Sequence, residues 1–119
     1  LGFSCQGMCF RIRPKNLKRE LLKVWEREMF AETYIPSWIK VKTKDSYLSA
    51  VTFVINNKHK HYLANLNIEE IAERVNRAEG TCGTCHDYVK NTVKYLHQFG
   101  LSDKNLENLL RKINITKEN

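Results

Sequence analysis

The amino-acid sequence predicts an α+β domain, in which a small, mostly antiparallel sheet packs against helices. Segments rich in β-branched and aromatic residues fall in the first half of the chain, and segments with the apolar spacing of helices fill the second half. A chain of 119 residues suits one domain, which buries roughly two-thirds of the surface that its unfolded chain exposes. We therefore expect a single domain over residues 1–119.

Three segments have the composition of strands. Residues 3–13 are rich in Phe, Cys, Met and Ile and end at Pro14, which predicts a first strand. Residues 38–43 alternate apolar and charged side chains, and residues 47–55 are strongly β-forming. Because polar residues 44–46 supply a turn between them, we expect these last two segments to pair as a hairpin.

The first helix is expected to start at Asn16, a good capping residue, and to repeat apolar residues at three- and four-residue intervals. It should end before Ile35-Pro36, because the residue that precedes a proline avoids the helical region.

Three more helices are expected in the second half. Asn67 is predicted to cap a helix over residues 68–79. Another helix is expected near residues 86–99, and Gly100 should end it. Ser102 is predicted to cap the last helix.

The predicted sheet has too few strands to close a core, and one of its edges is exposed. Exposed edges in native proteins are usually paired or covered. The chain also opens on the apolar run Leu1-Gly2-Phe3, without an initiator methionine. We therefore expect a domain that lacks its first strand or strands and is incomplete at its N-terminal end.

The chain carries 20 Lys+Arg against 13 Asp+Glu, a formal net charge of +7. Such an excess is compatible with a nucleic-acid partner. The cations alternate with apolar positions as on solvated faces, with no basic stripe of interleaved aromatics, so we do not expect that partner. Apolar runs fall short of the ~18 residues that a membrane span needs. Without a targeting signal, we expect no membrane partner and a reduced, cytoplasmic setting.

Glu28 interrupts the apolar face of the first helix. At ~100° per residue, position 28 continues that face, whereas Glu26 and Arg27 project away as surface charges. The face consists of Leu17, Leu21, Val24 and Trp25. A carboxylate that faces a core is costly unless it is paired or lies in a cavity, where desolvation suits general acid–base catalysis. Catalysis, a structural pair with a buried Arg or Tyr, and an earlier end of the helix all remain open.

The segment Cys82-Gly83-Thr84-Cys85-His86 fits the pattern of c-type haem attachment, which needs an exported protein. A zinc site could be assembled from Cys82, Cys85, His86 and one of Cys5 or Cys9. The spacing of Cys5 and Cys9 is poor for a metal site, because these residues would lie ~13 Å apart on a strand. A thioredoxin-like motif would need a βαβ setting. Two small thiols in a tight loop before a helix are the simpler interpretation, so we expect no metal site.

Several segments, in order, resemble the ChaC-like γ-glutamylcyclotransferases. The most specific is the run Val24-Trp25-Glu26-Arg27-Glu28-Met29, and the supporting segments cover nearly the whole chain. They are Cys5-Gln6-Gly7 through Phe10-Arg11-Ile12, Tyr34-Ile35-Pro36-Ser37-Trp38, Thr52 to Asn56 with His61-Tyr62, Gly80 to Tyr88, and Leu96 to Asp103. The resemblance implies a small, mostly antiparallel mixed sheet or barrel packed with helices.

The resemblance also implies an activity and its residues. Family enzymes cleave glutathione, a γ-glutamyl peptide, to 5-oxoproline and cysteinylglycine in a lyase-type reaction without a cofactor. Glu28 matches the glutamate that takes a proton from the substrate's α-amine and returns one to the leaving nitrogen. Tyr88 and, more weakly, Tyr34 match positions that line the substrate pocket.

Two departures from the family pattern qualify these expectations. The family's Tyr-Gly-Ser-Leu loop, whose backbone N–H groups hold the γ-glutamyl end, has no counterpart here, so we expect little activity from these 119 residues alone. Cys85-His86-Asp87 replaces an Asn-containing stretch of the family. The alternative is a catalytically degraded member that binds a partner, or a second copy by strand exchange, through the open sheet edge.

Overall fold

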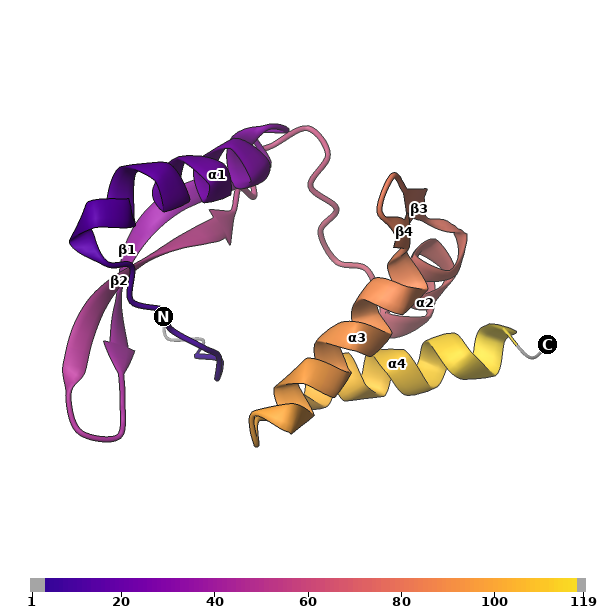
Figure 1. The fold of residues 1–119 in the computed structure, drawn as a ribbon. Helices are drawn as coiled ribbons and strands as arrows, with labels where there is room; N and C mark the ends of the chain where they lie inside the picture. Colours follow the sequence, from indigo (N-terminus) through magenta and orange to yellow (C-terminus); the bar gives the residue numbers. More distant parts are fainter. Residues whose placement is uncertain (1–3, 118–119) are drawn as a thin grey trace. The chain divides into compact units, whose positions relative to one another are not determined.

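The computed structural model describes residues 4–117, which form two compact units (Figure 1). The N-terminal unit is Cys9–Ala64. The C-terminal unit is built on the residues from Asn65 onward and also takes in the segment up to Met8. The single domain over residues 1–119 stays a prediction.

The N-terminal unit contains one helix and one hairpin. A 3-10 turn, Pro14–Asn16, leads into α1, Leu17–Met29, and the strands β1, Tyr34–Lys42, and β2, Tyr47–Ile55, follow. Asn16 occupies the capping position, as predicted, but its side chain makes no capping hydrogen bond. The helix ends before Pro36, as predicted.

The predicted strand over residues 3–13 is wrong for the described residues, because residues 4–13 contain no strand. Residue 3 lies outside the described part of the chain. A strand needs hydrogen bonds to a neighbouring strand, and an apolar composition cannot supply them by itself. In the described residues the only partner of β1 is β2.

The predicted hairpin is confirmed, and it starts earlier than expected. β1 and β2 pair antiparallel from Tyr34 opposite Ile55 to Lys42 opposite Tyr47. A proline at position 36 is tolerated because β1 is an edge strand. Phe53 contacts Trp25 of α1 edge-to-face, with ring centroids 6.0 Å apart. The face of the hairpin that bears Phe53 therefore packs against α1.

The C-terminal unit contains α2, Ile68–Arg77, the two-residue strands β3, Glu79–Gly80, and β4, Gly83–Thr84, then α3, Cys85–Gln98, and α4, Lys104–Lys117. Its buried core joins the three helices through Ala72, Val75, Val89 and Ile113. Asn67 forms the predicted cap as a full capping box, in which its Oδ1 accepts from the backbone N–H of Glu70 at 2.9 Å.

The predicted ends of the later helices are partly right. Gly100 follows α3 with a φ of +69°, a conformation that suits glycine at a helix end. The predicted cap Ser102 is wrong by one residue. Asp103 Oδ1 accepts from the backbone N–H groups of Asn105 and Leu106 at 2.9 and 3.1 Å, so Asp103 is the cap of α4.

The α+β class is confirmed, with helices and small antiparallel sheets. The strands of residues 4–117 form two separate two-stranded sheets and no closed barrel. Among these residues, no helix is both long and apolar enough to cross a bilayer.

Candidate active site

Glu28 lies in the last turn of α1 and is sheltered without being buried. Its side chain is 24% exposed, compared with 75% for the neighbouring Arg27. No residue of α1 is buried, so its apolar face is only half-covered in the described structure. Glu28 thus lies at a partly covered surface, where a substrate can reach its carboxylate.

Arg27 forms an ion pair with Glu28. Its Nε and one terminal nitrogen lie 2.8 and 2.7 Å from the same oxygen, Glu28 Oε1. This corrects the expectation that Arg27 projects away as a separate surface charge. The long arginine side chain folds back onto the adjacent carboxylate, which helical periodicity of Cα positions does not reveal. Oε2 of Glu28 receives neither contact.

Tyr34 is the first residue of β1, directly opposite Ile55, and it is half-buried. Residues 34 and 36 of β1 share a sheet face with residues 55 and 53 of β2, because directly opposed residues point the same way. That face is the one that Trp25 of α1 contacts. Tyr34 therefore lies on the sheet face that α1 covers, and Glu28 belongs to that helix.

Tyr88 belongs to the C-terminal unit. It lies on the first turns of α3 and is 72% exposed. The structure thus brings two of the three predicted site residues, Glu28 and Tyr34, into one unit and places Tyr88 in the other.

The glycine-containing segment before Tyr88 is a tight hairpin that leads directly into α3. β3 and β4 pair around Thr81 and Cys82, and Thr84 then caps α3 by accepting from the N–H of Asp87 at 3.1 Å. Cys85 packs against the C-terminal core. His86 Nε2 lies 3.0 Å from Asn114 Oδ1 of α4. Cys85, His86 and Asp87 thus have local structural roles.

The cysteines are all free thiols: Cys5, Cys9, Cys82 and Cys85. Within residues 4–117, no three or more His, Cys, Asp or Glu side chains gather as a metal site would require.

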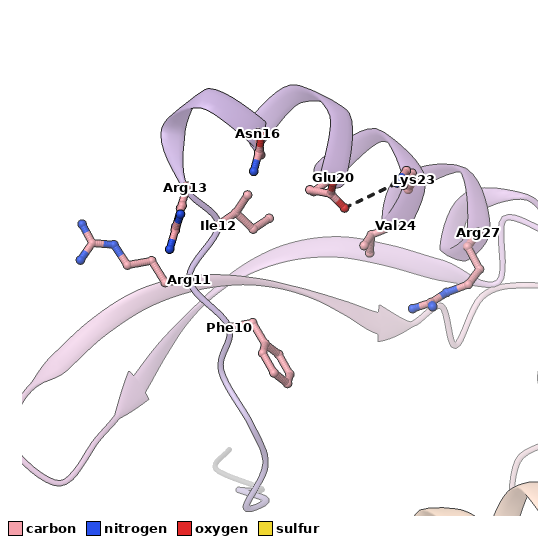
Figure 2. A pocket seen from close by; sticks show the side chains of 9 residues that line it. All are labelled: Phe10, Arg11, Ile12, Arg13, Asn16, Glu20, Lys23, Val24 and Arg27. Carbon is pink, nitrogen blue, oxygen red and sulfur yellow. Dashed lines mark ion pairs between the residues drawn. The ribbon is translucent and has the colours of Figure 1, made fainter.

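A basic pocket beside α1 was not predicted from the sequence. It has a volume of about 610 Å³ and lies between residues 10–13 and α1 (Figure 2). Its charged lining residues are Arg11, Arg13, Glu20, Lys23 and Arg27. The sequence carries cations two residues apart before the helix and four residues apart within it, a pattern that by itself predicts only solvated faces.

The charge of the chain is divided unevenly between the two units. Residues 9–64 contain 12 Lys+Arg and 5 Asp+Glu, which accounts for the whole net charge of +7. The remaining residues contain 8 of each and are neutral overall. The N-terminal unit, with Glu28 and the basic pocket, therefore attracts anions.

Two curated relatives are similar to this chain over most of its length. Glutathione-specific gamma-glutamylcyclotransferase of Escherichia coli (strain K12) is 29% identical over 110 residues, which cover 92% of this chain and 48% of the relative. Gamma-glutamylcyclotransferase 2-3 of Arabidopsis thaliana is 25% identical over 116 residues, which cover 92% of this chain and 58% of the relative. The chain thus spans about half the length of the curated relatives it matches.

A family model described as ChaC-like protein matches residues 2–116, nearly the full length of the chain. This match agrees with the two relatives and with the segment around Glu28, and the chain therefore belongs to the ChaC-like protein family.

Proposed function

We propose that this protein is a γ-glutamylcyclotransferase that converts glutathione, or another γ-glutamyl peptide, to 5-oxoproline and the remaining amine, which is cysteinylglycine for glutathione. The reaction is of the lyase type, uses no cofactor and takes place in the cytoplasm. Membership of the ChaC-like family and the activity for which the Escherichia coli relative is named support the proposal. The observation that carries it is the accessible carboxylate of Glu28 at the end of α1.

The proposed reaction is intramolecular, so the protein has few chemical tasks. The α-amine of the γ-glutamyl group attacks the γ-carbonyl carbon and forms the new C–N bond of a five-membered ring. The amide bond to cysteine then breaks, and its nitrogen leaves as the amine of cysteinylglycine. Because both reacting groups belong to one molecule, holding a bent conformer supplies much of the rate enhancement.

Glu28 carries the proton in this mechanism. Its carboxylate accepts a proton from the attacking amine and returns one to the leaving nitrogen, so no water is consumed. Both Arg27 contacts fall on Oε1, which leaves Oε2 to exchange the proton with the substrate. Tyr34 and Tyr88 are proposed to bind the substrate.

The test is 5-oxoproline formation from glutathione by the natural full-length protein. Glu28→Gln keeps the size of the side chain and removes the carboxylate that accepts and returns the proton, so turnover should fall by about 10²-fold or more. Glu26→Gln is the matched control, because Glu26 is an exposed glutamate two residues away on the same helix. Circular dichroism confirms that both variants fold. Unchanged turnover in a folded Glu28→Gln protein would show that Glu28 has a different role.

A second candidate function is a family member without turnover that associates through the hairpin. Within the described residues, β1 and β2 pair only with each other, so each strand keeps one unpaired edge. This candidate expects a dimer with no 5-oxoproline formation. Light scattering after size exclusion measures the oligomeric state, and a monomer at all concentrations would count against it.

A further inference from the structure

We propose that the basic pocket binds a small polyanion, a compound with two or more phosphate or carboxylate groups, and that this anion competes with Glu28 for Arg27. The pocket has a volume of about 610 Å³, enough for a small organic molecule. Its cations come from two walls, the segment of residues 10–13 and the helix α1 (Figure 2).

Positive charge exceeds negative charge at the pocket. Four cations and one carboxylate, Glu20, line it. Arg19, which lies outside the lining, binds this carboxylate through Nε at 2.9 Å, and Lys23 Nζ lies 3.8 Å from its other oxygen. Glu20 is therefore already neutralised. Within residues 4–117, Arg11 and Arg13 form no ion pair, so their guanidinium groups are available to an anion.

The lining also defines the chemistry of the ligand. Guanidinium groups present forked N–H donors that match the oxygens of phosphate and carboxylate groups. Phe10, Ile12 and Val24 contribute an apolar surface to the same pocket. A ligand with anionic groups on a carbon frame uses both kinds of surface, and one with a single charge would leave most of the cations unpaired.

Arg27 connects the pocket to Glu28. It lines the pocket, and its Nε and a terminal nitrogen both contact Glu28 Oε1. An anion that takes these donors releases Glu28 Oε1, and the Glu28 carboxylate in turn weakens the anion's hold on Arg27. Such coupling is reciprocal, so each partner lowers the affinity of the other for Arg27. The consequence for proton transfer rests on the role of Glu28 proposed above, whereas the binding site does not.

The test measures binding by titration calorimetry at constant ionic strength, with pyrophosphate and citrate as separate probes and sodium chloride as the background. Arg27→Gln should weaken binding of the favoured probe by about threefold or more. Lys18→Gln is the matched control, because Lys18 is an exposed cation of the same helix that does not line the pocket. Its affinity should stay within about twofold of the natural protein.

Two further variants separate the pocket from the coupling. Lys23→Gln removes a lining cation that does not touch Glu28 and should also weaken binding. Glu28→Gln removes the competing charge and should therefore tighten binding of the favoured probe, by about twofold or more. The carboxyl ¹³C resonance of Glu28 should shift when the probe binds.

Preference for pyrophosphate would identify a phosphate ligand, and preference for citrate would identify a carboxylate ligand. Failure of both probes to bind, or equal losses in Lys18→Gln and Arg27→Gln, would overturn the site. Unchanged affinity in Glu28→Gln would overturn the coupling. Since none of these measurements requires turnover, they are distinct from a failure of the proposed enzyme activity.

Discussion

Gly83 adopts a backbone conformation that side chains disfavour. Its φ is +115°, between the turn residues Thr81 and Cys82 and the cap residue Thr84. Gly80 faces it across the same hairpin without a positive φ. A Cβ added at either glycine would meet no atom within 4 Å. Backbone strain, rather than crowding, therefore distinguishes the two positions.

Gly83→Ala should lower the free energy of unfolding by about 1–2 kcal/mol, because alanine is strained at this φ. Gly80→Ala should change it by less than about 0.5 kcal/mol. Urea unfolding followed by circular dichroism measures both variants. Equal destabilisation by the two substitutions would show that the hairpin does not depend on the conformation of Gly83.

Asp103 caps helix α4, and substitution can test what this cap contributes to stability. The Asp103 carboxylate accepts two backbone N–H groups of the first turn and adds a negative charge at the positive end of the helix. Asp103→Ala should cost about 1 kcal/mol of stability. Ser102→Ala should cost less than about 0.5 kcal/mol. Thermal unfolding of the two variants compares them directly, and the reverse order would restore Ser102 as the cap.

The elements with local signals were predictable, and those that depend on distant partners were not. The capping box at Asn67 and the hairpin turn before Tyr47 are encoded within a few residues, so their positions could be predicted. Residues 4–13 have a strand composition but need a partner strand. The cap of α4 was missed because Ser102 and Asp103 are both good caps, and only the hydrogen bonds distinguish them.

The candidate site shows the same division. The place of Glu28 on the first helix followed from periodicity, since residues at three- and four-residue spacing share a helix face. The Arg27 pair could not be predicted, because a long side chain can turn back toward a neighbour that projects elsewhere. The basic pocket was missed for a related reason. It combines cations from residues 10–13 with cations from α1, and only the fold brings these segments together.

At the scale of the molecule, the C-terminal unit depends on polar contacts between segments far apart in the sequence. Lys112 Nζ of α4 lies 2.7 Å from Glu69 Oε1 of α2. Asn76 Nδ2, also on α2, donates to the carbonyl of Ile113 at 3.2 Å. Both contacts border Ile113, which is fully buried. The interface between α4 and α2 therefore has an apolar centre, the buried Ile113, and a titratable edge, the ion pair of Lys112 with Glu69.

The titratable edge should make stability depend on pH. The hydrogen bond from Lys112 holds the pKa of Glu69 below its ordinary value of 4.5. A carboxyl with a lower pKa in the folded state adds stability above its unfolded pKa, and the added stability is lost as pH falls through the folded pKa. Glu69→Gln should therefore lower Tm at neutral pH, and the difference from the natural protein should shrink as the pH falls below 4.5. Glu73→Gln is the control on the same helix, because within residues 4–117 the one ion-pair partner of Glu73 is Arg77, one turn away and at 3.8 Å. A Tm difference for Glu69→Gln that stays constant from neutral to acid pH would show that the Lys112 contact does not stabilise the ionised carboxyl.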